Sequence, residues 1–380
     1  MNRDRFPGLG DGWARLDAPG GSQPVDAAIE ATADYMRSGA MANQGGEFEA
    51  AERVDALMSS GRATVGELLG GDPRGVVFGP SMTTLTLSFA TAVGRTLSAG
   101  DEIVCTRIDH DANVAPWLIA AGRAGATVRF AEPDPDTLEL PVSAVEAVLG
   151  ERTRWVAVTA ASNAVGTVPD LPSITAAAHA AGARVYVDAV HATPHRRIDV
   201  AALGVDALAC SAYKWFGPHE SVLWAQPELL EELTPDKLRP SSDEVPFRWE
   251  TGTPAFESIA GTIAAARYVM DTGLDAIRAH EDALMRRMVD GLRAIDGVTL
   301  YGAPPDRTPT AMFNVARRKA GEVAAALAAE KVAVWNGNYY AYELERFLGL
   351  APDGAVRAGL VHYNDESDVD RLLEGVDRLA

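Results

Sequence analysis

Short apolar segments rich in β-branched residues alternate with alanine-rich segments between residues 75 and 225. The apolar segments have the length of strands and no polar face, which is typical of parallel strands covered by helices on both sides. They lie at 75–79, 102–106, 126–130, 154–160, 184–190 and 207–212. This alternation predicts an α/β fold with a mostly parallel sheet.

Helices are expected between these strands, and the residues at their ends support the assignment. The helical segments run over 81–97, 114–125 and 171–182. Ser81 is a suitable N-cap, and Gly125 and Gly182 stand where a helix is expected to stop.

The pattern changes near Pro254. A long helical segment over 258–295 comes first, and shorter strands and helices fill the rest of the chain. We therefore expect a large domain over 21–254 and a smaller α+β domain over 255–380. Residues 1–20 are expected to pack on the smaller domain.

Composition and charge narrow the function classes. The 380 residues are 47% hydrophobic, and their net charge of −19 would repel nucleic acid. No apolar run approaches the ~18 residues of a membrane span, and the N-terminus carries no secretory pattern. We expect a cytoplasmic protein with no nucleic-acid or membrane partner. Two cysteines, Cys105 and Cys210, cannot build a disulfide framework.

Common nucleotide and hydrolase motifs are absent from the chain. There is no G-x-G-x-x-G after a strand, no P-loop and no G-x-S-x-G. The pair His191 and His195 is interrupted by Pro194 and lacks a further ligand at a diagnostic spacing, so no metal is expected.

A lysine is the remaining candidate for chemistry. The chain has only four, and Lys214 alone follows an apolar strand, between Tyr213 and Trp215. Burial would lower the pKa of its amine and make it nucleophilic, as a Schiff-base lysine requires. The alternative is a lysine that extends from the sheet edge into solvent.

Two further features accompany this lysine. Asp188 ends the strand over 184–190, at the edge where open α/β sheets bind ligands, and a carboxylate there suits the pyridinium nitrogen of pyridoxal 5'-phosphate (PLP). The turn over 79–84 joins a strand to a helix and is rich in Gly, Ser and Thr, which favours a phosphate.

With these features the chain resembles the PLP-dependent aminotransferase class V family, and within it the cysteine desulfurase/selenocysteine lyase-like branch. The segments that carry the resemblance are FGPSMTT (78–84), DHDANVAPW (109–117), ASNAVGT (161–167), VYVDAVHATPH (185–195), CSAYKWFGP (210–218), ETGTP (250–254) and AVRAGLVHYNDESDVDRL (355–372). The resemblance implies fold type I, with a seven-stranded sheet between helices and a small C-terminal α+β domain. It also implies a homodimer with shared active sites and a small amino-acid substrate.

The resemblance also implies roles for individual residues. Lys214 would bind PLP as a Schiff base and move the Cα proton, while Asp188 would hold the ring nitrogen. The other implied cofactor contacts are Ser81, Met82, Thr83, Asp111, Asn163, His191, Ser211, Tyr213 and, toward the other subunit, Thr253. The implied substrate contacts are Arg357, which would pair with the α-carboxylate, and Asn338, Tyr339 and Tyr340.

Structural roles remain alternatives for several of these residues. His191 would then be a core histidine, Arg357 a member of a surface ion pair, Tyr213 a packing residue of the sheet and Asn163 a turn residue.

The chain departs from the family in two places. Where the family has a histidine stacked on the cofactor, the matching position is Asp111, with His110 one place earlier. Where desulfurases carry a nucleophilic cysteine, this chain has Tyr339 and Tyr340. Without that thiol, no persulfide forms on the protein by the usual route.

We therefore expect a PLP enzyme that acts on an α-amino acid. A C–S or C–Se lyase that works by β-elimination needs no protein thiol, and transamination is the alternative. A binding protein that has lost catalysis is a third alternative. The sequence leaves the substrate side chain open.

Overall fold

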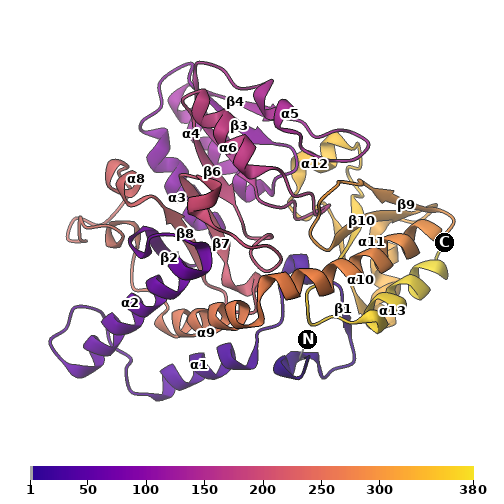
Figure 1. Cartoon of the computed structure of the whole chain (residues 1–380), viewed down its shortest axis with the longest axis horizontal. Coiled ribbons are helices and arrows are strands. Elements are labelled where there is room, and N and C mark those ends of the chain that lie inside the picture. Colours follow the sequence, from indigo (N-terminus) through magenta and orange to yellow (C-terminus); the bar gives the residue numbers. More distant parts are fainter. Residues whose placement is uncertain (1–2) are drawn as a thin grey trace.

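The computed structural model describes residues 3–380 and is built around a seven-stranded sheet of order β2-β8-β7-β6-β5-β3-β4 (Figure 1). Its strands are β2 (Val76–Gly79), β3 (Glu102–Thr106), β4 (Thr127–Ala131), β5 (Thr153–Thr159), β6 (Arg184–Asp188), β7 (Ala207–Ser211) and β8 (Ser221–Ala225). Only the two pairings of β8 are antiparallel. The expectation of an α/β fold with a mostly parallel sheet is confirmed.

Two strands differ from the sequence prediction. β8 was not predicted; it follows β7 after a short connection that contains a 3-10 helix but no α-helix, and it pairs with β7 as an antiparallel neighbour. β4 was expected to be buried on both faces, but Thr127 and Arg129 are exposed. The reason is its place at the edge of the sheet, where helices cover it incompletely.

Helices cover both faces of the sheet. They are α1 (Asp26–Arg37), α2 (Glu49–Leu69), α3 (Met82–Gly94), α4 (Ala115–Ala124), α5 (Val142–Glu146), α6 (Leu171–Ala180), α7 (Val200–Leu203) and α8 (Pro227–Glu232). Along β6, Tyr186 packs into the cluster that contains α3 and α4, whereas Val185 and Val187 pack into the cluster that contains α2 and α6. Successive side chains of this strand thus pack into two separate apolar layers, one on each face of the sheet.

The predicted helix caps are present. The Ser81 side chain accepts a hydrogen bond of 3.1 Å from the Thr84 amide, so it caps α3. Gly125 ends α4 with a φ of 71°, a conformation that only glycine adopts without strain.

The C-terminal part holds a four-stranded antiparallel sheet of order β12-β13-β10-β9. Its strands are β9 (Val298–Tyr301), β10 (Thr310–Val315), β12 (Trp335–Gly337) and β13 (Ala355–Gly359), and its helices are α10 (Leu274–Ala294), α11 (Ala320–Ala329), α12 (Tyr342–Phe347) and α13 (Glu366–Asp377). The long helix predicted over 258–295 is two helices, because Gly273, with a φ of 82°, separates α9 (Phe256–Thr272) from α10.

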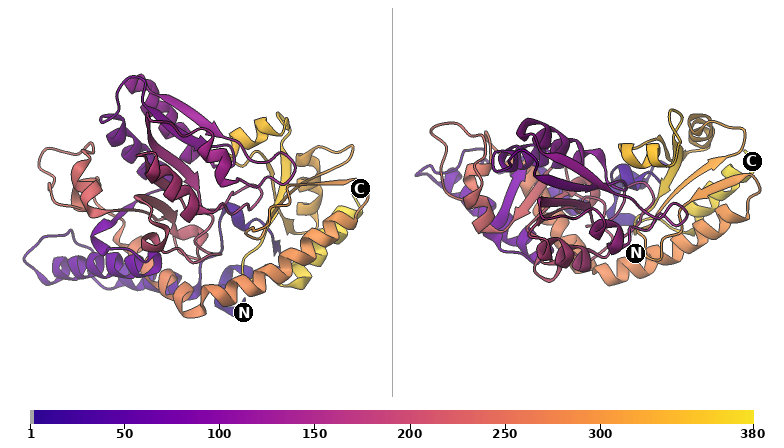
Figure 2. Two further views of the ribbon diagram at one scale, coloured as in Figure 1. Left: turned by 45° about the horizontal axis from the view of Figure 1, so that its top comes forward. Right: turned by 90° about the horizontal axis from the view of Figure 1, so that it is seen from above.

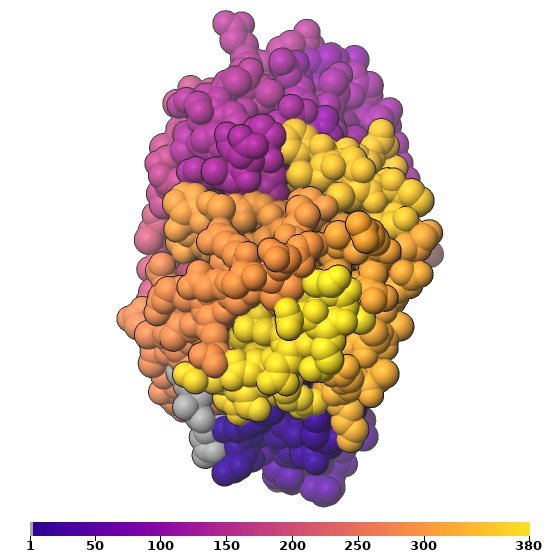
Figure 3. Space-filling view, turned by 90° about the vertical axis from the view of Figure 1, so that its right-hand side faces the viewer, coloured from indigo at the N-terminus to yellow at the C-terminus, as the bar shows by residue number. Residues whose placement is uncertain are grey.

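The N-terminal segment joins the two parts. Its strand β1 (Ala14–Arg15) pairs in parallel with β11 (Val332–Ala333), and the Arg3 guanidinium lies 2.8 Å from Asp368 of α13. Figure 2 shows α10 extending from the large sheet along the small one, and Figure 3 shows the N-terminal and C-terminal segments in contact at the surface. The domain boundaries at 20 and 254 remain predictions.

Within the described residues, no helix is both long and apolar enough to cross a membrane.

A buried ion pair connects α2 to the segment before α9. Arg62 and Glu250 form two hydrogen bonds of 2.8 and 2.9 Å, and both side chains are less than one tenth exposed. Glu250 also accepts the Phe78 amide of β2. The pair thus fixes the turn over 250–254 against the sheet.

We predict that Arg62→Ala lowers the free energy of unfolding by about 3–5 kcal/mol, because it leaves a buried carboxylate without its cation. Urea denaturation measures this change. Arg53→Ala on the same helix removes an exposed pair with Glu49 and should cost less than about 1 kcal/mol. Equal losses in the two variants would contradict the assignment.

Candidate active site

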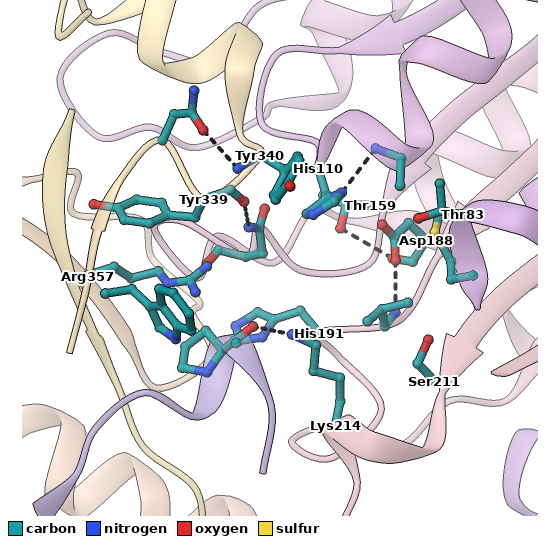
Figure 4. Close-up of a pocket in the computed structure, with 18 of the residues that line it drawn as sticks. Thr83, His110, Thr159, Asp188, His191, Ser211, Lys214, Tyr339, Tyr340 and Arg357 are labelled. Atoms are coloured by element: carbon teal, nitrogen blue, oxygen red, sulfur yellow. Dashed lines mark hydrogen bonds between the residues drawn. The ribbon is translucent and has the colours of Figure 1, made fainter. Parts of the chain in front are cut away.

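A cavity of about 650 Å³ opens at the carboxyl ends of β5, β6 and β7. Three distant parts of the chain form its wall: the N-terminal segment, the large sheet with its loops, and the segment from β12 to β13 (Figure 4). The predicted residues that line it are Ser81, Met82, Thr83, Asn163, Asp188, His191, Ser211, Tyr213, Lys214, Asn338, Tyr339, Tyr340 and Arg357. Of the residues predicted from the sequence, only Asp111 and Thr253 are absent from the lining.

Lys214 lies at the end of a short 3-10 helix (Ala212–Lys214) that directly follows β7. It is 9% exposed, and its ammonium lies 5.0 Å from the centroid of the Tyr213 ring. Its Nζ donates to the Pro19 carbonyl of the N-terminal segment. Burial lowers the pKa of Lys214 to about 7, and the positive charge of Arg357 contributes to this shift. A substantial fraction of this amine is therefore neutral near pH 7.

Asp188 ends β6 and is 4% exposed. Its Oδ1 accepts the Val190 amide at 2.9 Å, and burial raises the pKa of the carboxyl to about 6. His191, three residues later, lies 3.0 Å from the hydroxyls of both Thr308 and Thr310. Burial holds the pKa of His191 well below its usual value, so this imidazole is neutral.

The end of the cavity near α3 is suited to an anion. Ser81, Met82 and Thr83 stand at the N-terminus of this 13-residue helix, where backbone amides lack helical partners. Ser211 of β7 lines the same cavity, and its hydroxyl lies 2.8 Å from that of Ser221. The view in Figure 4 places Thr83 and Ser211 across the cavity from Arg357.

Arg357 of β13 is 3% exposed, and no carboxylate lies within ion-pair distance of it among residues 3–380. It therefore does not belong to a surface ion pair. Its Nη1 donates to the Asn163 carbonyl at 2.8 Å, and its guanidinium lies 4.5 Å from the Tyr339 ring centroid. Its buried Nε and the buried Oδ1 of Asn163 have no hydrogen-bond partner among residues 3–380. Burial lowers the pKa of Arg357 to about 10.

His110, rather than Asp111, lines the cavity, and the expectation that Asp111 contacts the cofactor stays a prediction. The histidine lines the cavity and stacks on Tyr340 at 5.3 Å. Its Nδ1 accepts the Ala112 amide at 3.0 Å, and burial lowers its pKa to about 4, so the ring is neutral. Asp111 begins the 3-10 helix Asp111–Asn113 and is not part of the lining.

The segment with Tyr339 and Tyr340 is a tight turn. Both residues have left-handed backbone conformations, with φ values of 51° and 59°, which are costly for side chains of this size. Two hydrogen bonds hold their carbonyls: Asn163 donates to that of Tyr339 at 2.9 Å and the Asp111 amide to that of Tyr340 at 2.7 Å. The Tyr339 hydroxyl donates to the Ala355 carbonyl.

Neither cysteine reaches the cavity. Cys105 lies within β3 and Cys210 within β7, and both are fully buried. Burial raises the pKa of both thiols, that of Cys210 to about 12. Both side chains are therefore neutral packing residues of the sheet.

The comparisons with known proteins agree with this geometry. The model of the family "Aminotransferase class-V" matches residues 14–372. The chain belongs to the aminotransferase class V family. It is similar to a cysteine desulfurase of Klebsiella pneumoniae subsp. pneumoniae, with 34% identity over 96% of this chain and 92% of the relative.

Two further proteins are similar over nearly the whole chain. An uncharacterized protein of Mycobacterium tuberculosis (strain CDC 1551 / Oshkosh) is 33% identical over 100% of this chain and 98% of its own length. The apo structure of a cysteine desulfurase from Thermococcus onnurineus NA1 has a TM-score of 0.93 and 27% identity, with 99% of this chain and 96% of that chain covered. The fold is therefore fold type I, and the protein is a PLP-dependent enzyme.

The residues of the cavity fit this cofactor. A buried amine with a lowered pKa, a buried carboxylate and a helix N-terminus surround one space, which matches the aldehyde, the ring nitrogen and the phosphate of PLP. The unpartnered polar atoms of Asn163 and Arg357 are further groups that a bound molecule satisfies.

Sequence reasoning missed several lining residues. They are Pro19, Gly20, Ala112, Thr159, Ala161, Val190, Trp335, Asn336, Gly337, Glu345 and Pro352. Pro19 and Trp335 come from segments that local patterns do not connect with the sheet. Thr253 is exposed and outside the cavity, so its predicted contact with the other subunit stays a prediction.

We predict that Lys214 makes the stability of the cofactor-free protein depend on pH. Its pKa is about 7 when folded, against an ordinary value of 10.5. Between these values the unfolded chain binds one proton more than the folded chain, so this group makes stability increase as the pH rises from 7 to 10.5. Lys214→Met should be more stable than the wild type at pH 7, and this advantage should shrink toward pH 10.

Urea denaturation of the two cofactor-free proteins between pH 7 and 10 checks this prediction. Lys319→Met is the control, since Lys319 is exposed and pairs with Asp353 at the surface. A constant difference between the Lys214→Met variant and the wild type over this range would contradict a lowered pKa at Lys214.

Proposed function

We propose that the protein is a PLP-dependent lyase that removes a sulfur or selenium substituent from the β-carbon of an α-amino acid, without a persulfide on the protein. One observation supports this above all: the cavity has a buried lysine and a buried arginine, but both thiols of the chain are inside the sheet. Desulfurase-like chemistry then proceeds by elimination. An S-substituted cysteine and water give a thiol, pyruvate and ammonia.

In this proposal each lining residue has a defined task. PLP, when bound, supplies an electron sink that stabilises negative charge at Cα. Lys214 accepts the Cα proton, because a substantial fraction of its amine is neutral near pH 7. Asp188 keeps the ring nitrogen protonated, and Arg357 binds the substrate carboxylate through two parallel hydrogen bonds.

The remaining lining residues bind or orient. Ser81, Met82, Thr83, Ser211 and Tyr213 hold the phosphate, and His191 and Asn163 lie beside the ring oxygen. His110 is proposed as the stacking residue in place of Asp111, because its neutral ring faces the cavity. The Tyr339 hydroxyl is an unsuitable acid, since it already donates to Ala355 and burial raises its pKa.

The reaction type is tested with a panel of amino acids. The holoenzyme is incubated with cysteine, S-substituted cysteines and alanine, and pyruvate, sulfide and pyridoxamine phosphate are measured. Elimination predicts pyruvate from the S-substituted cysteines and none from the Lys214→Ala variant. Pyridoxamine phosphate without pyruvate would reject the lyase in favour of transamination.

We predict that a double variant, Cys105→Ala with Cys210→Ala, retains kcat within about threefold of the wild type. Neither thiol lines the cavity, so the substitutions remove only packing atoms, at a cost of about 1–2 kcal/mol each in stability. Pyruvate release measures kcat, and urea denaturation confirms that the variant is folded. Loss of turnover in a folded variant would mean that a protein thiol takes part.

We also propose a homodimer with shared active sites, in which Thr253 contacts the phosphate bound by the other subunit. Thr253 is exposed in the single chain, and the neighbouring Glu250 is fixed by Arg62, which supports a rigid turn presented at the surface. Light scattering should give twice the chain mass of 40.2 kDa. Thr253→Ala should weaken PLP binding by about tenfold, the loss of roughly one charge-assisted hydrogen bond. A monomer with unchanged PLP affinity would contradict both parts.

A further inference from the structure

One charged residue of the cavity has no task in the proposed reaction. Glu345 of α12 lines the cavity and is only 9% exposed. Its Oε2 accepts the Asn338 side-chain amide at 3.2 Å. Its Oε1 accepts no hydrogen bond, and no Lys or Arg pairs with the carboxylate, within residues 3–380. Oε1 is therefore free to accept a hydrogen bond from a ligand in the cavity.

Charge is distributed unevenly in the cavity. The two cations, Lys214 and Arg357, are buried together, and each lacks a carboxylate within ion-pair distance over residues 3–380. In the proposed reaction PLP uses Lys214, and the substrate carboxylate uses Arg357. Glu345 then remains as the unused charge of the lining, and its sign is negative.

Two exposed aromatic side chains line the same cavity. Trp335 and Tyr340 are 49% and 71% exposed, and one face of the Tyr340 ring stacks on His110. Aromatic faces attract organic cations, by about 0.5–2 kcal/mol each depending on solvent exposure. A cavity that offers a carboxylate and exposed aromatic rings can recognise an ammonium group.

From this arrangement, and resting on the proposed function, we infer that Glu345 selects substrates whose sulfur substituent ends in an ammonium group. The substrate class is a β-thio amino acid with a second, distal amino group, such as an aminoalkyl thioether of cysteine. The α-carboxylate binds Arg357, and the distal ammonium binds Glu345.

The reaction balances without any oxidant or reductant. With S-(2-aminoethyl)-L-cysteine, Lys214 takes the Cα proton, the Cβ–S bond breaks, and sulfur leaves with the electron pair and gains a proton. Water then releases ammonia and pyruvate, and the other product is 2-aminoethanethiol.

Two matched substrates isolate the role of the charge. S-(2-aminoethyl)-L-cysteine and S-propyl-L-cysteine have the same length, and an ammonium group in one replaces a methyl group in the other. The wild-type holoenzyme should favour the aminoethyl compound in kcat/KM by at least about tenfold. In Glu345→Gln this ratio should fall by about 10- to 100-fold, mainly through KM, because a desolvated charge contact is lost.

The control is Glu343→Gln. Glu343 lies on the same helix, pairs with Arg107 and does not line the cavity, so this variant should keep the wild-type ratio. A binding measurement complements the kinetics. In the Lys214→Ala background, calorimetry with the same two compounds should show tighter binding of the aminoethyl compound, and Glu345→Gln should remove that difference.

The outcomes separate this inference from the proposed function. Equal losses for both compounds in Glu345→Gln would overturn it, since Glu345 would then only support Asn338. Pyruvate from S-propyl-L-cysteine without any preference for the ammonium would also overturn it, while the lyase function stands. If no S-substituted cysteine yields pyruvate, the lyase proposal fails, and the calorimetry in the Lys214→Ala background still decides whether Glu345 binds the ammonium.

Discussion

Two basic side chains buried in one cavity are the constraint on which this structure depends. Lys214 follows a strand of the large sheet and Arg357 lies in the small sheet; burial lowers the pKa of both, and the charge of Arg357 further lowers that of Lys214. Without ligands, this arrangement costs free energy, because burial removes water from both groups and no carboxylate pairs with either within residues 3–380. Anionic groups of a cofactor and a substrate relieve that cost. The free-energy cost of burying these two basic groups thus favours the binding of anionic ligands in the cavity.

The rest of the fold keeps these charges in place. Lys214 directly follows β7 at the end of the large sheet, and Arg357 lies within β13 of the smaller sheet. Pro19 accepts a hydrogen bond from Lys214, and β1, a few residues earlier, pairs with β11. The N-terminal segment therefore contacts both parts of the molecule and closes the cavity between them. Its position explains why a site on the large sheet depends on residues at both ends of the chain.

Much of this could be predicted from the sequence, because local patterns determine it. The apolar segments and caps located β2 to β7 and the main helices, and the position of Lys214 after a strand indicated a buried amine. The errors have physical causes. β8 was missed because no α-helix separates it from β7 and marks where it begins. β4 was predicted to be buried on both faces because its position at the edge of the sheet is not visible in the sequence.

The site residues that were missed depend on tertiary contacts. The choice between His110 and Asp111 depends on how a 3-10 helix turns, which neighbouring residue types do not reveal. Glu345 looks like an ordinary surface residue of a short helix, and its burial comes from the packing of α12 against the cavity. Pattern reasoning therefore finds residues that follow regular elements and misses those placed by distant segments.

The turn at Tyr339 and Tyr340 has a consequence for redesign. A nucleophile that carries sulfur from a substrate to an acceptor must move between them. The loop that bears it must therefore break its contacts at a small cost in free energy. Here Asn163 and the Asp111 amide donate hydrogen bonds to the carbonyls of Tyr339 and Tyr340. The Tyr339 side chain also contacts the Arg357 guanidinium and donates to the Ala355 carbonyl. A cysteine grafted onto this turn would be anchored in one place. Conversion into a sulfur-delivering enzyme would require a longer, looser segment as well as a thiol.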